Sequence, residues 1–268
     1  MTAARKVRLA TPGDKPVIEH LLRTGFGDEE SFLCAFFEHV FPYCDTLLSL
    51  DNGAVAAMAA LIPCEIIQKG QENLPALYLY SLTTLPDYRG RGHAKALLAA
   101  AQEKCSRVFL HAADDSLFQM YGRLGWRPMM HACYTEMPPA IPQTVFQEIN
   151  GDEYYRLREL ALKNAPHIRW NKHTCRFLHD MLTAYGGGLY LAHEAVIAVE
   201  EERDGILYLG EAFGREAPRL AAELSLRYAC NTSYLLTPCT ADTPGAFPMA
   251  QGVGAPIPDI LQISFVFL

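Results

Sequence analysis

The chain has 268 residues, of which 50% are hydrophobic and 20% are charged, and it carries a formal net charge of −7. This length suits two globular domains, and the acidic balance argues against nucleic acid as a partner because phosphate backbones repel it. The longest apolar run, residues 54–63, is far shorter than the roughly 20 residues that cross a bilayer, and no signal-peptide core follows the first basic residues, so we expect a cytoplasmic protein with no membrane partner.

The first half of the chain begins with a short strand, followed by two helices and a hairpin. Apolar residues recur at three- and four-residue steps from Phe32 to Val40, which is typical of a helix. The sequence Asp51-Asn52-Gly53 between two apolar runs predicts a tight turn. The predicted elements are strand 7–10, helices 16–26 and 28–40, strands 46–50, 54–63 and 76–85, helix 92–104, strand 108–112, helix 116–124 and strand 127–136.

A proline-dense segment, Met137–Pro142, follows these elements. It cannot continue a helix or a central strand, so we place a domain boundary there. The second half repeats the order strand, two helices, three strands, helix and strand, which predicts a repeated fold. His167, Arg169 and Trp170 lie between its first two helices, where they either pack in a loop or line a substrate cleft.

The first helix of the second half is predicted to be capped by Asp152. The predicted elements of this half are strand 145–149, helices 152–163 and 172–185, strands 189–192, 195–201 and 206–211, helix 217–229, strand 233–237, a Pro/Gly-rich loop 240–258 and a last strand 261–267.

The eight cysteines form no Cys-x-x-Cys pair, and none has metal-ligand spacing with a histidine. Most lie in apolar stretches, where a reduced cysteine acts as a small hydrophobic residue. The sequence therefore predicts reduced structural cysteines and no metal site.

A short loop with two glycines joins the buried strand that ends before Pro86 to the helix that begins near Gly92. At a helix N-terminus the first backbone N–H groups have no partner within the helix and carry a partial positive charge. Glycines at positions 90 and 92 keep side chains away, so a phosphate oxygen can approach the backbone. Arg89 and Arg91 add positive charge. The segment Arg89–Ala94 is therefore predicted to bind a pyrophosphate.

The pattern of this segment, Arg-x-x-Gly-x-Ala, differs from two familiar phosphate loops. The dinucleotide fingerprint needs a glycine where residue 95 is Lys, and the NTPase loop needs Gly-Lys-Ser/Thr. The segment instead resembles motif A of the GNAT superfamily of acetyl-CoA-dependent acyltransferases, Arg/Gln-x-x-Gly-x-Gly/Ala. About thirty residues downstream, Met120–Trp126 resembles the family's second signature, Leu-Tyr-x-x-x-Gly-Phe, with Trp126 in place of Phe. The resemblance covers roughly residues 5–136.

This resemblance implies an α/β fold of the α+β type, with two GNAT-like domains, each a mixed, mostly antiparallel central sheet flanked by helices. Residues 1–138 would form the acetyl-CoA-binding catalytic domain. Residues 143–268 would form a degenerate domain that lacks the pyrophosphate loop, similar to the second domain of tandem-GNAT acetyltransferases. The segment 212–218 does not have the motif, and Glu216 would oppose a phosphate. We expect a monomer or a homodimer.

The family's roles in donor binding carry over to matching positions. Main-chain groups of Leu82–Thr84 would pair with the pantetheine arm at a bulge of the central strand. Amides from Arg89 to Ala94 would hold the pyrophosphate. Asp114 stands where many members have Asn, which leaves its role open, and Phe118 would face the cofactor. The residues implied to bind acetyl-CoA are Leu82, Thr83, Thr84, Arg89, Gly90, Arg91, Gly92, His93, Ala94, Asp114 and Phe118.

The family's catalytic tyrosine corresponds to Tyr121, which would be the general acid that protonates the leaving thiolate. The acceptor must react as a neutral amine, because an ammonium group has no lone pair. Since the pKa of an ammonium group is near 10, little neutral amine is present at pH 7, and a base must remove the proton. Glu65, His111 and Glu136, all on predicted strands, are the candidates for the base, and the sequence does not choose between them.

Three functions follow from these residues. The first is an N-acetyltransferase that moves the acetyl group of acetyl-CoA to a primary amine of a small molecule or peptide by direct attack. The second is a non-catalytic CoA-binding module, against which the intact Tyr121 argues. The third is a tandem-GNAT transferase with another acyl donor. The complete Arg-x-x-Gly-x-Ala pattern favours a CoA donor over an aminoacyl-tRNA, and the acidic charge agrees.

Overall fold

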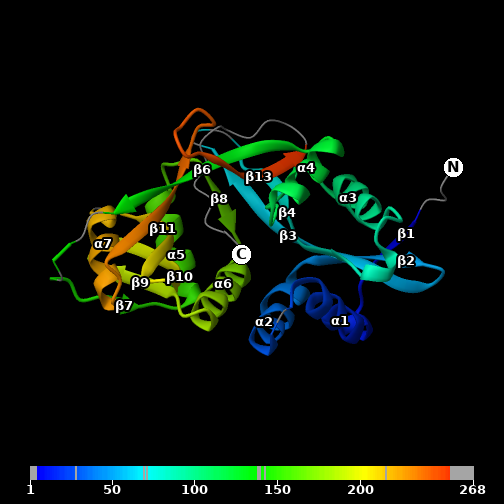
Figure 1. The fold of residues 1–268 in the computed structure, drawn as a ribbon, viewed down its shortest axis with the longest axis horizontal. Coiled ribbons are helices and arrows are strands. Elements are labelled where there is room, and N and C mark those ends of the chain that lie inside the picture. Colours follow the sequence, from blue (N-terminus) through cyan, green and yellow to red (C-terminus); the bar gives the residue numbers. More distant parts are fainter. Residues whose placement is uncertain are drawn as a thin grey trace. The chain divides into compact units, whose positions relative to one another are not determined.

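The computed structural model divides into two compact units (Figure 1). It describes residues 5–27, 29–68, 70, 72–137, 140–141, 143–214 and 216–253. Within these ranges, unit 1 contains residues up to 65, residues 75–127 and residues 251–253, and unit 2 contains residues 66–74 and 128–250. Each unit is built around a mixed, mostly antiparallel sheet flanked by helices, as predicted.

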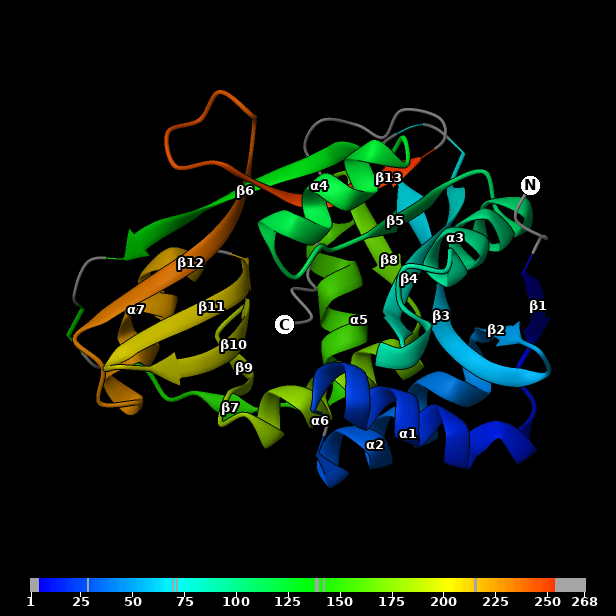
Figure 2. The ribbon, with the colours of Figure 1, turned by 45° about the vertical axis from the view of Figure 1, so that its right-hand side comes forward.

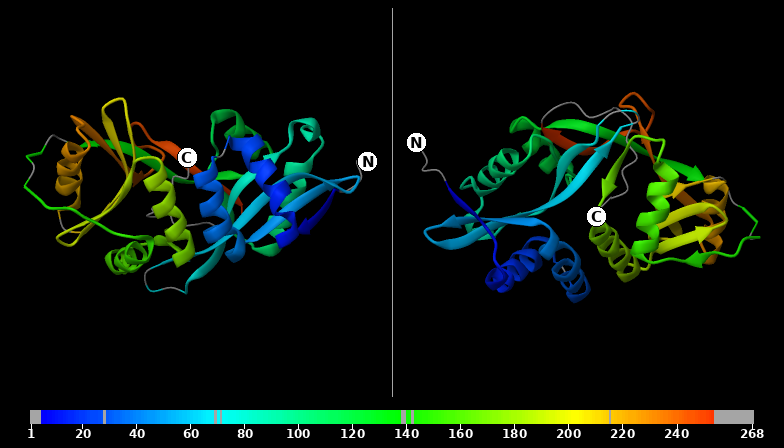
Figure 3. Two further views of the ribbon diagram at one scale, coloured as in Figure 1. Left: turned by 90° about the horizontal axis from the view of Figure 1, so that it is seen from below. Right: turned by 180° about the vertical axis from the view of Figure 1, so that it is seen from behind.

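The helices of unit 1 lie on both faces of its sheet. Its elements are β1 (Lys6–Leu9), α1 (Lys15–Phe26), α2 (Glu30–Ala35), β2 (Asp45–Asp51), β3 (Ala54–Ile67), β4 (Leu74–Thr84), α3 (His93–Lys104), β5 (Val108–Leu110) and α4 (Asp115–Arg123). Helices α1 and α2 cover one face, and α3 and α4 cover the other (Figures 1 and 3). Leu97 and Leu98 of α3 pack with Tyr121 of α4 and with apolar residues of the sheet.

The predicted hairpin is confirmed. Strands β2 and β3 pair antiparallel, and the last pair of their ladder joins Asp51 to Ala54. Asn52 and Gly53 have φ angles of 49° and 90°, which are the left-handed conformations that a two-residue hairpin turn requires. The turn therefore fixes Asp51 at the end of β2.

The second predicted helix, 28–40, is interrupted. Its α-helical part, α2, ends at Ala35, and a π-helical turn follows over Phe36–Val40. The Phe41 N–H bonds the carbonyl of Phe36, five residues back. Pro42 has no N–H to continue the α-helical pattern, which is why the helix cannot run on regularly. Asp28, where the prediction began, lies outside the described residues.

The prediction of an irregular loop over residues 240–258 is wrong in its centre. Strand β13 (Phe247–Val253) forms there, and its residues 251–253 pair antiparallel with β5, Gln251 opposite Leu110 and Val253 opposite Val108. The strands of unit 1 thus lie in the order β1-β2-β3-β4-β5-β13. A strand formed by such a distant partner has no local signal. The last predicted strand, 261–267, lies outside the described residues.

Unit 2 repeats much of the element order of unit 1. Its elements are β6 (Arg127–Met137), β7 (Gln147–Glu148), α5 (Gly151–Leu162), β8 (His167–Trp170), α6 (Lys172–Ala184), β9 (Gly188–Ala192), β10 (Ala195–Arg203), β11 (Ile206–Phe213), α7 (Ala217–Arg227) and β12 (Thr232–Cys239). Its sheet has the order β6-β12-β11-β10-β9-β7. Helix α7 packs on one face over Leu207, Leu209 and Leu235, and α5 and α6 lie on the other face (Figure 2).

Two details of unit 2 correct the sequence analysis. The segment of His167 and Trp170 is the strand β8, and both side chains are buried. Helix α5 is capped by Asn150, whose side chain accepts hydrogen bonds from Asp152 and Glu153 N–H groups. The predicted cap, Asp152, lies inside the first turn instead and forms an ion pair with Arg176 at 2.7 Å.

The proline-dense linker is only partly described, since its three prolines lie outside the described residues. The boundary between residues 138 and 143 therefore stays a prediction. Among the described residues, no helix is long and apolar enough to cross a membrane.

Candidate functional site

The central strand of unit 1 is distorted shortly before the glycine loop. Ser81 in β4 has a φ of 50°, a conformation that non-glycine residues rarely adopt in a strand and that marks an irregularity such as a bulge. The parallel ladder joins Leu77 to Val108 and Tyr78 to Phe109. Within the described part of the chain, no register pair joins Leu82–Thr84 to β5. Main-chain groups at this end of β4 are therefore open on the β5 side, as the predicted pantetheine contact requires.

Helix α1 fixes the same end of β4 from the other face of the sheet. Thr83 is buried, and a β-carbon on Gly25 of α1 would overlap the Thr83 side chain. Helix and strand can approach this closely only because residue 25 is glycine. The Thr83 side chain is thus used for packing, which leaves its backbone for a ligand.

The glycine loop opens the N-terminus of α3. Gly90 and Gly92 have φ angles of 73° and 86°, and a β-carbon on either would meet nothing within 4 Å. The helical hydrogen bonds begin with the Ala96 N–H, which donates to the Gly92 carbonyl at 3.1 Å. The N–H groups of the three preceding residues, 93–95, come before this first helical bond and point along the helix axis. They carry the positive end of the helix dipole.

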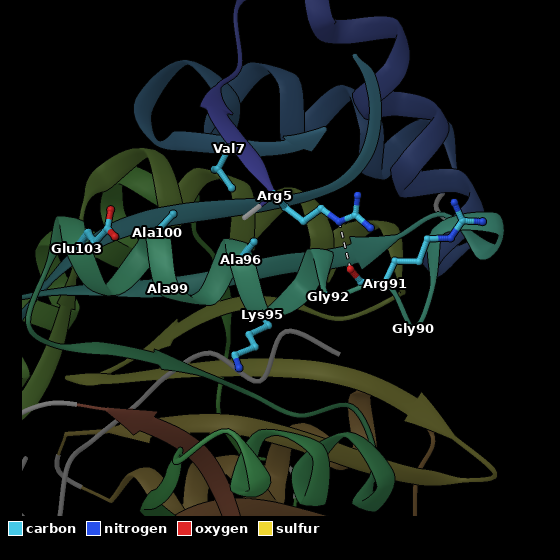
Figure 4. A pocket seen from close by; sticks show the side chains of 10 residues that line it. All are labelled: Arg5, Val7, Gly90, Arg91, Gly92, Lys95, Ala96, Ala99, Ala100 and Glu103. Carbon is cyan, nitrogen blue, oxygen red and sulfur yellow. Dashed lines mark hydrogen bonds between the residues drawn. The ribbon is translucent and has the colours of Figure 1, made fainter. Parts of the chain in front are cut away.

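A hollow of about 770 Å³ lies along α3 beside β1. Three cationic residues line it near the loop, Arg5, Arg91 and Lys95, and Glu103 lines its far end (Figure 4). Arg5 donates to the carbonyl of Arg91 at 3.2 Å. The concentration of positive charge at the helix N-terminus favours an anion there.

The side chain of Arg89 has a different role from the one that charge alone suggests. It is exposed, and its Nε donates to the Thr84 carbonyl at 3.2 Å. This bond ties the loop to the end of β4.

Asp51 fixes the glycine loop in place through ion pairs with two arginines. Its carboxylate is 6% exposed and pairs with Arg5 at 3.0 Å and with Arg91 at 3.3 Å. Sequence reasoning missed this role because it interprets Asp-Asn-Gly as a turn, and no local signal joins Asp51 to an arginine that is 40 residues away. A buried carboxylate between two arginines fixes both guanidinium groups in place.

The side chain of His93 also fixes the start of α3 in place. Its Nδ1 lies 2.9 Å from the Ser49 hydroxyl, and its Nε2 lies 3.8 Å from Asp51. Burial lowers the pKa of His93, and the charge of Arg5 adds to this effect. The neutral imidazole therefore anchors the first turn of α3 to β2, and the backbone N–H of residue 93 stays at the helix end.

The second sequence signature lies on α4. Tyr121 is 5% exposed, and burial, followed by the nearby charge of Asp114, raises its pKa to about 12. Asp114 is the N-cap of α4, because its side chain accepts from the Leu117 N–H at 2.8 Å. The Phe118 carbonyl accepts a hydrogen bond from the Gln251 side chain at 3.0 Å, so β13 also contacts this helix.

The three candidates for the base lie on different elements. Glu65 lies on β3 and His111 directly follows β5, and both are half-buried in unit 1. Glu136 is exposed on β6 in unit 2. Their roles stay predictions. In the described part of the chain, no three side chains of the metal-binding types gather into a site.

The sequence model of the acetyltransferase (GNAT) domain family matches residues 6–129. A search of the curated proteins finds no match. The matched segment contains the loop, α3 and α4, so the family model covers the candidate site described above.

Several solved structures share the fold over nearly the whole chain. A probable N-acyltransferase from Enterococcus faecalis is 11% identical with a TM-score of 0.71, over 92% of this chain and 72% of that one. A putative acetyltransferase from Pyrococcus horikoshii is 14% identical with a TM-score of 0.56, over 98% and 94%. A tandem GNAT protein from the clavulanic acid biosynthesis pathway is 15% identical with a TM-score of 0.54, over 93% and 97%. At these identities, the likeness concerns the fold alone.

Proposed function

Because residues 6–129 match the model of the acetyltransferase (GNAT) domain family and the fold is similar to that of a tandem GNAT protein, we propose that this chain transfers the acetyl group of acetyl-CoA to a primary amine of a small molecule or peptide. The family and the tandem arrangement agree with the sequence analysis, and the family is one of acyltransferases. The observation that carries the proposal is the open N-terminus of α3, with free N–H groups and three cationic side chains beside it.

The pyrophosphate of the donor fits this helix end. Amides of residues 90–94 would bind its oxygens, and Arg5, Arg91 and Lys95 would offset its charge. Gly90 and Gly92 leave open space where β-carbons would otherwise stand. Arg5 and Arg91 are already held by Asp51, so little side-chain entropy is lost when the donor binds.

The arm of the donor would lie along the open end of β4. The main chain of Leu82–Thr84 would pair with the amides of the pantetheine, as an added strand does. This placement follows from the distortion at Ser81 and from the short ladder between β4 and β5. Asp114 caps α4, so we propose that it shapes the helix start rather than replacing the family's asparagine in a cofactor contact.

In the reaction, the amine nitrogen attacks the thioester carbonyl carbon and the carbon–sulfur bond breaks. The Tyr121 hydroxyl donates its proton to the leaving thiolate. Its raised pKa of about 12 means that it carries this proton at neutral pH. The proton of the attacking amine goes to a base, for which Glu65, His111 and Glu136 are the candidates.

We propose that the chain binds one donor. Residues 1–138 form the catalytic domain, and residues 143–268 form a GNAT-like domain without its own donor. In unit 2 the helix that corresponds to α3 is α7, and its N-cap, Glu216, has a carboxylate paired with Arg219 at 3.2 Å. A carboxylate at that position repels a phosphate.

The test is the release of free thiol from acetyl-CoA by the full chain across a panel of primary amines. We expect release that depends on one class of amine, and one acetyl-CoA bound per chain in calorimetry. Tight CoA binding without thiol release for any amine would favour the non-catalytic module. No CoA binding at all would contradict the proposal and favour another acyl donor.

A further inference from the structure

One face of the unit 2 sheet, together with the first residue of β13, which also belongs to unit 2, carries a cluster of aromatic side chains from β6, β11, β12 and β13. We call Tyr134, Tyr208, Tyr234 and Phe247 the aromatic surface. The Tyr134 ring meets Tyr208 edge-on at 5.7 Å and lies 5.7 Å from Phe247. Tyr208 stacks on Tyr234 at 6.1 Å. The four rings are thus in continuous contact.

This surface faces away from α7. Side chains alternate along a strand, and Leu207, Leu209 and Leu235 pack against α7. Tyr208 and Tyr234 lie between or beside these leucines in sequence and therefore point to the opposite face. Tyr134 is 40% exposed. The Tyr134 ring is therefore accessible, and the other three rings are half-buried.

Glu200 is buried on β10, the strand next to β11, and has no hydrogen-bond or ion-pair partner among the described residues. It is 7% exposed, and it lies at a shift in the β10–β11 ladder, between Val199 and Glu201. Among the described residues, no hydrogen bond or ion pair involves its carboxyl group. A β-carbon on Gly210 would overlap this group, so the glycine leaves room for it. Buried polar groups without partners are rare and call for an explanation.

The electrostatics connect Glu200 to the aromatic surface. Burial raises the pKa of Tyr134 to about 12, and the charge of Glu200 is the next cause. Burial also raises the pKa of Glu200 to about 8, with smaller contributions from Glu201 and Glu211. Glu211 is already neutralised by Arg158 at 3.1 Å. Glu200 is therefore the unpaired acid beside the rings.

The side chain of Arg203 already lies against the edge of the aromatic surface. The Arg203 guanidinium lies 4.8 Å from the centroid of the Tyr208 ring and pairs with Glu201 at 3.3 Å. Ring faces attract organic cations through the negative charge of their π-systems. Within the described residues, Arg203 forms no hydrogen bond or ion pair with Glu200, although its charge also reaches Tyr134.

We propose that the aromatic surface and Glu200 together bind an organic ammonium group. The rings would contact the carbon atoms next to the nitrogen and the cation itself, and the Glu200 carboxylate would supply the opposite charge. This binding does not depend on acetyl transfer, and it would occur without acetyl-CoA.

A bound cation also changes the protonation of its partner. The free Glu200 carboxyl, with a pKa of about 8, is mostly protonated at pH 7. The cation favours the carboxylate, so binding at pH 7 releases a proton. The other charged groups around it are Glu201 on its own strand, Glu211 with Arg158, and Arg203 at the edge.

The probe is 2-phenylethylammonium, and its neutral analogue of the same shape is 2-phenylethanol. Calorimetry on the full chain at pH 7, without acetyl-CoA, is run in two buffers with different ionisation enthalpies. We expect the ammonium compound to bind at least 10-fold more tightly than the alcohol, with release of up to one proton. Glu200→Gln should weaken binding of the ammonium compound by at least 10-fold and abolish proton release. The matched control, Glu202→Gln, changes an exposed acid of the same strand and should have no effect.

Equal binding of the two probes, or unchanged ammonium binding by Glu200→Gln, would overturn the inference. If Glu200→Gln does not fold, Tyr134→Leu at the exposed edge replaces it, with an expected loss of about 5-fold. Thiol release from acetyl-CoA is measured separately. Ammonium binding without thiol release would contradict the proposed function alone, and thiol release without ammonium binding would contradict this inference alone.

Discussion

The two units begin a helix in the same way after a sheet strand, yet the charges at the two helix ends are opposite. Gly92 caps α3 with a φ of 86°, and Glu216 caps α7 with a φ of 62°. Both are left-handed caps without a side-chain hydrogen bond to the helix. At α3 the cap has no side chain and cationic groups lie nearby, whereas at α7 the cap is a carboxylate and Pro218 removes one N–H. The backbone turn alone therefore does not make an anion site.

The buried acidic side chains of the two units also differ in what their partners contact. In unit 1, Asp51 holds two arginines whose side chains line the hollow beside α3. In unit 2, Glu211 accepts hydrogen bonds from Tyr154 and Arg158, and all three are buried. We infer that the ion pairs of Asp51 in unit 1 serve a ligand and that those of Glu211 in unit 2 serve the fold.

Gly92→Glu gives α3 the cap of α7 and should have the largest effect. A carboxylate about 4 Å from a phosphate costs about 4 kcal/mol at an effective dielectric of 20, which corresponds to a rise of about 1000-fold in the Kd of acetyl-CoA. Calorimetry measures this Kd. Glu216 shows that a glutamate can occupy such a cap in a folded unit.

Gly92→Ala is the control, since it adds backbone strain without charge, and Glu216→Gln changes the corresponding cap in unit 2. Neither should approach the effect of Gly92→Glu. If Gly92→Ala weakened acetyl-CoA as much as Gly92→Glu does, strain and not charge would explain the loss.

Glu211→Gln tests the structural charges of unit 2. It leaves the buried Arg158 without its counter-ion, which should lower the free energy of unfolding by about 3 kcal/mol. Urea denaturation measures this loss, and the Kd of acetyl-CoA should not change. Glu194→Gln alters an exposed acid of the same unit and should be neutral. A loss of donor affinity in Glu211→Gln would break the division between ligand and fold.

Tyr121→Phe removes a group that has no counterpart in the described part of unit 2, where β12 is followed in sequence by β13 rather than by a helix. We expect kcat to fall by about 100-fold, with the Kd of acetyl-CoA nearly unchanged. The wild-type tyrosine, with a pKa of about 12, stays protonated up to pH 10, so its ionisation should not limit activity below that pH. Tyr43→Phe, at an exposed site, is the control. Equal kcat values for Tyr121→Phe and wild type from pH 6 to 10 would exclude the general acid.

Asn150→Ala removes the side chain that caps the N-terminus of α5. Loss of this cap should lower the free energy of unfolding by about 1 kcal/mol. Asp152→Ala, which removes only a surface ion pair with Arg176, should cost less than about 0.5 kcal/mol. Denaturation curves of the two variants compare them. If Asp152→Ala lowered the free energy of unfolding more than Asn150→Ala does, Asp152 would be the cap, as the sequence predicted.

The sequence predicted those features whose cause lies within a few residues. The hairpin followed from Asn52 and Gly53, and the loop before α3 followed from Gly90 and Gly92, because each conformation depends on a glycine or asparagine at that position. The order of the other elements followed from apolar periodicity, apart from β8 and β13. The family signatures then assigned the loop a function that local physics alone made only plausible.

Features that depend on distant partners were missed. Asp51 gains its role from Arg5 and Arg91, which the turn sequence does not reveal. Strand β13 lies in a Pro/Gly-rich segment and exists because β5 pairs with it. The cap of α5 was misplaced by two residues, since Asn150 and Asp152 are both good capping residues and only the backbone decides between them.

The place of β13 has a consequence for how the protein is made. Residues 251–253 pair with β5, so about 140 residues separate the two partners in the chain. Because a ribosome extends the chain at roughly 5–20 residues per second, β5 waits on the order of ten seconds for its neighbour. Unit 1 therefore stays incomplete until residues 251–253, which follow residues 128–250 of unit 2, have been synthesised. A nascent chain halted before residue 251 exposes an unpaired strand edge, which is a point of attachment for chaperones or for other unfinished chains.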